Sequence, residues 1–185
     1  MSPILDLIEW VDESGGEIVH REPQVGSGEF RLGSQLVVRE SQRAIFMRDG
    51  RALDQFGPGR HTLSTANLPI LADLIGAVFG GRSPFRAEVV FVSMRRFLDL
   101  KWGTPQPIIF RDAELGMVRL RAFGGYAMEV ADPGLFVATV VGTQGAYTTN
   151  EIGDYLRGVI VSELTTVLGG LLTSILDLGG RYAEV

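Results

Sequence analysis

The 185-residue sequence has no cysteine and only two histidines, His20 and His61. Without thiols the chain has no disulfide framework, no thiolate metal site and no cysteine nucleophile, which fits a cytoplasmic location. The two histidines stand apart without an acidic cluster, so we expect them to be surface or packing residues and expect no metal site. Ser64 or Ser93 with His61 would supply the residue types of a nucleophilic triad, but neither serine lies in a nucleophile elbow. We therefore expect no catalytic residues and no cofactor.

Positive charge is also scarce, since 17 Lys and Arg against 22 Asp and Glu give a net charge of −5. Nucleic-acid binding needs a concentrated cationic surface, and the arginines are scattered along the sequence, so we predict no nucleic-acid partner. Long apolar runs are missing as well. The longest nearly uncharged run, residues 68–81, is shorter than the roughly 20 residues of a membrane-spanning helix. The N-terminus lacks a basic region ahead of an apolar one, so no signal peptide is predicted.

Apolar residues make up 45% of the chain, enough for one globular domain, and their spacing changes along it. Strand-like runs cover residues 16–22, 34–40, 44–48, 87–93 and 116–131. In the last run, Gly124-Gly125 breaks the alternation, either as a bend in one strand or as a turn between two. Residues 101–107 and 111–116 are expected to be turn segments.

Two glycine-rich segments contain residue patterns that predict turns. Asp49-Gly50 lies between two strand-like runs and predicts a two-residue hairpin turn, and residues 57–59, Gly-Pro-Gly, predict a second bend. Residues 76–83, GAVFGGRS, match the phosphate-loop pattern except that Arg82 replaces its lysine. The run before them has helical spacing where a phosphate loop needs a strand. We therefore expect a glycine turn there, with a phosphate- or nucleotide-binding enzyme using Gly76–Ser83 as an alternative.

Helical signals begin after residue 131. Asp132 and Pro133 fit the N-cap and first position of a helix predicted over residues 133–141. Thr148 and Glu151 form a capping box for a longer helix, which Gly169-Gly170 interrupts. Its apolar stripe, a candidate packing or self-association face, comprises Ile152, Leu156, Val159, Ile160, Leu164, Val167 and Leu168. Strands first and helices later predict an α+β fold in which this helix covers the domain's own sheet.

Residues 3–11, PILDLIEWV, have apolar residues at helical spacing and predict a short amphipathic helix. This helix would cap the domain or lie on a membrane surface, although its acidic polar face disfavours the second role. The candidate membrane contacts are Ile4, Leu5, Leu7, Ile8, Trp10 and Val11.

Several blocks, taken in order, resemble the SPFH (stomatin, prohibitin, flotillin) or band 7 domain. They are RESQRAIF at 39–46, PGRHTLST at 58–65, and the step Tyr126, Val130, Asp132 and Pro133, within a resemblance that covers about residues 33–178. The sequence is most similar to a bacterial branch described as virion core protein-like. On this basis residues 1–32 are a lead-in, 33–178 the domain and 179–185 the start of a C-terminal extension.

The resemblance implies a strongly twisted, mostly antiparallel sheet packed against helices from the C-terminal half. It also implies a non-enzymatic scaffold that self-associates and organises a membrane surface or membrane-associated partners, at the inner face of the cell membrane. Relatives commonly continue into a coiled coil, and this branch into a zinc module, so we expect a longer protein in which assembly is stronger than in this fragment. The alternative is a soluble adaptor whose sheet edge accepts a partner strand.

Overall fold

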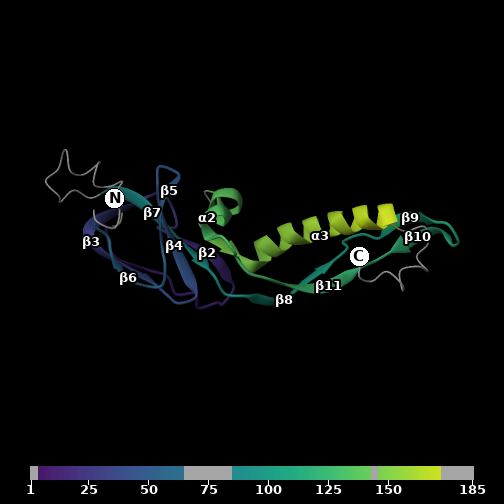
Figure 1. Cartoon of the computed structure of the whole chain (residues 1–185), viewed down its shortest axis with the longest axis horizontal. Helices are drawn as coiled ribbons and strands as arrows, with labels where there is room; N and C mark the ends of the chain where they lie inside the picture. Colours follow the sequence, from purple (N-terminus) through teal and green to yellow (C-terminus); the bar gives the residue numbers. More distant parts are fainter. Residues whose placement is uncertain (1–3, 65–84, 143–145, 172–185) are drawn as a thin grey trace. The chain divides into compact units, whose positions relative to one another are not determined.

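The computed structural model describes residues 4–64, 85–142 and 146–171, shown in colour in Figure 1. The chain divides into two compact units. The first comprises residues 1–96 and 129–149, and the second comprises residues 97–128 and 150–185. The fold is mixed α+β, as predicted, with most of the described residues in strands.

The first unit is built on an eight-stranded sheet. Its strands are β1 (Ile4–Glu9), β2 (Glu17–Glu22), β3 (Gly28–Val38), β4 (Gln42–Arg48), β5 (Arg51–Phe56), β6 (Gly59–Thr62), β7 (Phe85–Ser93) and β12 (Ala146–Thr148). Strand β7 pairs with β2, β3 and β4, and β3 pairs with β7 at its start and with β6 at its end. All these pairs are antiparallel and only β1 runs parallel to its neighbour β3, so the described sheet is mostly antiparallel, as expected.

The N-terminal segment is a strand, so the predicted amphipathic helix over residues 3–11 is wrong. Strand β1 pairs with β3, and burial follows the strand period, with Ile8 and Trp10 inside and Leu7 and Val11 outside. The Gln42 side-chain amide also donates a hydrogen bond to the Trp10 carbonyl oxygen at 3.2 Å. Long-range pairing with β3 thus outweighs the local helical spacing.

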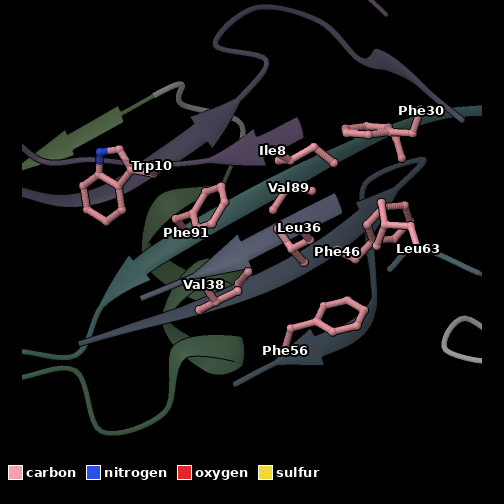
Figure 2. Close-up of a cluster of buried hydrophobic side chains, with 12 residues drawn as sticks. Ile8, Trp10, Phe30, Leu36, Val38, Phe46, Phe56, Leu63, Val89 and Phe91 are labelled. Atoms are coloured by element: carbon pink, nitrogen blue, oxygen red, sulfur yellow. The ribbon is translucent and has the colours of Figure 1, made fainter. Parts of the chain in front are cut away.

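One face of this sheet carries the main hydrophobic core, which Figure 2 shows in close-up. Alternate residues of each strand contribute to it because successive side chains point to opposite faces. The cluster comprises Ile8, Trp10, Phe30, Leu36, Val38, Ala44, Phe46, Phe56, Leu63, Ala87, Val89 and Phe91. The predicted lead-in boundary at residue 32 lies within β3, and Ile8 and Trp10 from the lead-in are part of this core.

The opposite face of β4 and β7 is buried too. Ile45, Val90 and Val92 are each no more than 2% exposed. The helix α2 (Pro133–Phe136) contacts β4 and continues into a π-helical turn, η1 (Val137–Val141). Because both faces are covered there, residues 89–92 of β7 form an apolar run that does not alternate.

Local turn and cap chemistry is confirmed in this unit. Asp49 and Gly50 both have positive φ, 51° and 73°, as a two-residue hairpin turn between β4 and β5 requires. The Asp132 side chain accepts a hydrogen bond from the Leu135 backbone N–H at 2.9 Å, and Pro133 begins α2 as predicted. The helical segment ends before Gly142, whose φ is 55°.

The second unit contains a long hairpin and a long helix. Its elements are β8 (Phe97–Gly103), β9 (Ile108–Asp112), β10 (Gly116–Leu120), β11 (Phe123–Met128) and, after its first residue, α3 (Thr149–Leu171). Strand β8 pairs with β11, and β9 pairs with β10. Residues 97–128 therefore form one hairpin with its tip at residues 113–115, and Figure 1 shows α3 running alongside it.

Three predictions fail in this unit. Lys101–Gly103 belongs to β8, so the turn expected over residues 101–107 begins only at Thr104. The break in the long strand falls at Arg121-Ala122, and Gly124-Gly125 lies inside β11. Helix α3 continues through Gly169-Gly170 to Leu171, because two glycines cost a long helix only about 2 kcal/mol.

A carboxylate fastens the loop after β1 to the end of β7. Asp12 accepts hydrogen bonds from the Ser14 hydroxyl at 2.7 Å, the Gly15 N–H at 2.8 Å and Arg95 Nη2 at 2.8 Å, and Arg95 also donates to the Gly15 carbonyl oxygen. Burial raises the pKa of Asp12, but the hydrogen bonds and the Arg95 charge outweigh it, so the net pKa is below its usual value.

We predict that Asp12→Asn lowers the free energy of unfolding by about 2 kcal/mol at neutral pH. Because the folded-state pKa is depressed, this stabilisation is present above the usual aspartate pKa and is lost as the pH falls through the folded-state value. Denaturant titrations of both proteins between neutral and acid pH should show the two stabilities converging. The exposed neighbour Glu13 supplies a control, Glu13→Gln, that should change little. If the difference in the free energy of unfolding between the unchanged chain and Asp12→Asn stays the same at acid pH, the prediction is contradicted.

Candidate interaction surface

Both histidines pack against aromatic rings, which is one of the two roles expected of them. His20 lies on the core side of β2, where its ring stacks on Trp10 with centroids 5.6 Å apart. Its Nδ1 is 3.2 Å from Glu17 and its Nε2 is 3.5 Å from Glu22. His61 lies against Phe56 and donates from Nε2 to the Gly57 carbonyl oxygen at 2.8 Å, which holds the bend between β5 and β6.

The enzyme alternatives find no support in the described residues. Neither Ser64 nor the buried Ser93 forms a hydrogen bond with His61. Within residues 4–64, 85–142 and 146–171, no group of three His, Asp or Glu side chains is arranged to hold a metal ion. The phosphate-loop candidate, residues 76–83, lies outside the described residues.

Two of the six residues of the predicted N-terminal membrane contact are not available at the surface. Ile8 is 0% and Trp10 3% exposed, so these two side chains belong to the core. Leu7 and Val11 are 50% and 53% exposed and remain candidates. The side chains of Ile4 and Leu5 lie outside the described part of the chain.

The predicted face of α3 is partly covered. Ile152 and Leu168, near its two ends, are buried. Leu156, Ile160, Leu164 and Val167 are half-buried. Val159 is 42% exposed and stands one turn after Tyr155, which is 63% exposed. The part of this helix that is open to a partner is therefore the pair Tyr155 and Val159.

The start of α3 lies against the hairpin of the same unit. A Cβ added at Gly153 would be 3.6 Å from the Tyr126 hydroxyl, so the helix backbone approaches β11 closely there. Burial raises the pKa of Tyr126, and Asp154 adds to this effect while Arg157 opposes it. The side of the hairpin that carries Tyr126 is therefore the side that faces the helix.

The two faces of the hairpin differ in exposure. From residue 117 to 128, even-numbered residues are half-buried and odd-numbered residues are exposed without interruption. The alternation continues across the break between β10 and β11 because Thr104 N–H donates to the Ala122 carbonyl oxygen at 2.9 Å. Ala122 N–H in turn donates to Thr104 Oγ1 at 3.2 Å. These two hydrogen bonds thus join the two arms at the break.

The exposed side, which we call the outer face of the hairpin, is basic and apolar. Its side chains are Lys101, Ile109, Arg111, Met117, Arg119, Arg121 and Phe123. Ile109, Met117 and Phe123 are 58%, 71% and 86% exposed. Across the strands, Met117 is paired with Arg111 and Arg119 with Ile109, so cations and apolar side chains lie next to one another. Within the described residues none of these cations forms an ion pair.

Sequence reasoning missed the outer face. The alternation of Arg119, Arg121 and Phe123 was visible in the sequence and indicated one wet face. What the sequence did not reveal was the partner strand, which places Ile109 and Arg111 on that same face. Arginines that are scattered along the chain therefore gather in the fold.

Comparison with known proteins agrees with this architecture. A family model described as SPFH domain-Band 7 family matches residues 19–185, so the chain belongs to that family. It is similar to the protein "Uncharacterized protein YdjI" of Bacillus subtilis (strain 168), 29% identical over 159 residues, which are 85% of this chain and 48% of the relative. The chain thus spans about half the length of that relative. No solved structure matches it.

Proteins of this family are generally membrane-associated, non-enzymatic scaffolds that commonly oligomerise. The family match begins at residue 19, within β2, and so extends further toward the N-terminus than the predicted domain start at residue 33. In the described residues, none of the helices has the length and apolar character needed to cross a membrane.

We predict that Gly124→Ala destabilises the hairpin by about 1–3 kcal/mol, because a Cβ there would lie 2.8 Å from Trp102 Nε1 and would displace the indole. Thermal unfolding and the near-ultraviolet circular dichroism of tryptophan report the change. The matched control is Gly125→Ala, whose Cβ would lie 3.6 Å from the Leu100 carbonyl oxygen, an ordinary van der Waals distance. Equal stability of the two variants would contradict the close packing of the Trp102 indole on Gly124.

Proposed function

We propose that this chain is a non-enzymatic scaffold domain that self-associates and organises a membrane surface or membrane-associated partners, peripheral to the inner face of the cell membrane. The observation that carries the proposal is the family match over residues 19–185. The exposed apolar pair Tyr155 and Val159, one turn apart on α3, supports it, because neighbouring apolar side chains at a surface mark interaction sites. The assignment to a virion core protein-like branch remains a prediction from the sequence blocks alone.

The remaining N-terminal candidate for membrane contact is the pair Leu7 and Val11. These side chains project outward from the same segment that anchors Ile8 and Trp10 in the core, so they can be changed without opening the core. Deleting residues 1–16 would remove β1 and two core side chains and would test stability instead of binding.

The proposal predicts that the chain floats with vesicles in a density gradient, and that Leu7→Ser/Val11→Ser reduces the floating fraction by removing exposed apolar area. Val25→Ser, at an 89% exposed side chain, is the matched control. If the unchanged chain fails to float with vesicles of any composition, its proposed membrane role is wrong. If the unchanged chain floats and Leu7→Ser/Val11→Ser floats equally well, the N-terminal contact is wrong and the membrane role stands.

Self-association is assigned to the exposed pair on α3. Light scattering over a range of concentrations should show a mass that rises weakly with concentration, since two exposed side chains offer little area. We predict that Tyr155→Ser/Val159→Ser keeps the monomer mass throughout, while Glu163→Gln on the same helix behaves like the unchanged chain. The same concentration dependence in all three proteins would contradict this assignment.

A further inference from the structure

The outer face of the hairpin combines positive charge with exposed apolar side chains. It carries four cations, Lys101, Arg111, Arg119 and Arg121, in a chain whose net charge is −5. It also exposes Ile109, Met117 and Phe123 between them. The exposed carboxylates of the hairpin, Asp99 and Glu114, lie toward its two ends, and Asp112 is buried, where it accepts hydrogen bonds from the tip of the turn.

The arrangement of these side chains is as informative as their composition. Odd-numbered residues 117–123 form one row along a single arm, in the order apolar, basic, basic, apolar. The second row, on the other arm, places Arg111 beside Met117 and Ile109 beside Arg119. The result is a two-row face, not a single pocket, and it suits an extended surface that carries negative charge above an apolar layer.

We propose that the outer face of the hairpin is a docking surface for an anionic lipid bilayer. Each Lys or Arg near such a surface strengthens binding about fivefold, and the apolar side chains between them can enter the boundary between head groups and acyl chains. Because the net charge of the whole chain is −5, an anionic membrane attracts this face more strongly than the acidic parts of the surface. The proposal rests on the proposed membrane role and assigns it to named residues.

A second copy of the chain fits the face less well. The helix α3 of such a copy offers the exposed carboxylates Glu151, Asp154 and Glu163. Asp154 is already paired with Arg157 at 2.8 Å, so the acidic charge on that helix is partly neutralised. Charge complementarity therefore favours lipid over α3 of another copy.

The experiment compares flotation of the chain with vesicles of phosphatidylcholine alone and of phosphatidylcholine mixed with phosphatidylglycerol, at low and high salt. We expect binding to the mixed vesicles that weakens with added salt, because exposed charges are screened. Arg119→Gln/Arg121→Gln should lower the partition coefficient for mixed vesicles roughly thirtyfold. Phe123→Ser should lower it roughly tenfold or more through lost apolar contact.

Two matched variants separate this face from general charge and apolar effects. Arg51→Gln/Arg60→Gln removes the same charge from exposed positions on β5 and β6 in the first unit, and it should leave binding nearly unchanged. Leu135→Ser, at a 61% exposed side chain, is the matched control for Phe123→Ser and should also leave binding nearly unchanged. Unchanged thermal unfolding in all variants shows that the fold is intact.

The outcomes are distinguishable. If the unchanged chain binds mixed vesicles and only the hairpin variants lose binding, the docking surface is confirmed. If the chain binds but both arginine pairs lose binding equally, or neither does, the docking surface is wrong while the membrane role stands. If the chain binds no vesicle, both fail. If Arg119→Gln/Arg121→Gln lowers the mass in light scattering and leaves flotation unchanged, the face joins copies of the chain, which overturns the lipid proposal.

Discussion

The first unit depends on the pairing of β7 along both of its edges. Residues 89–92 hydrogen-bond to β2 on one side and to β4 on the other, and they are buried on both faces of the sheet. No other described strand of this chain carries so much of the ladder and so much of the core at once. Strand β1 and the core residue Trp10 reach this arrangement through β3 and Gln42, so the lead-in is part of the same cooperative structure.

The second unit is built on the opposite principle. An isolated two-stranded ribbon is marginally stable in water, and this hairpin gains its support on one face only, where Tyr126 meets the start of α3 and Trp102 covers Gly124. The other face is left to solvent with its cations and apolar side chains. A sheet that is covered on one face only offers its other face as an interaction surface, whereas the sheet of the first unit is buried on both faces at residues 89–92.

How far the sequence predicts the fold depends on the range of each interaction. Asp49-Gly50 and Asp132-Pro133 act within a few residues of themselves, so their turn and cap could be predicted from local chemistry. The segment at residues 4–9 reads as a helix locally and becomes a strand because β3 is available as a partner. The outer face could be predicted only in part. The alternation at residues 117–123 is visible within one strand-like run, whereas Ile109 and Arg111 join this face only because β9 pairs with β10.

The break between β10 and β11, with the turn opposite it on the other arm, determines which insertions and deletions the outer face of the hairpin can tolerate. Between the Gly103–Phe123 pair and the Ile108–Leu120 pair, the first arm contains two more residues than the second. Because this difference of two residues is even, Lys101, Ile109 and Arg111 lie on the same face of the hairpin. An odd difference would move Ile109 and Arg111 to the opposite face from Lys101. Over evolutionary time, insertions and deletions at Thr104–Pro107 that preserve the surface should therefore occur in pairs of residues.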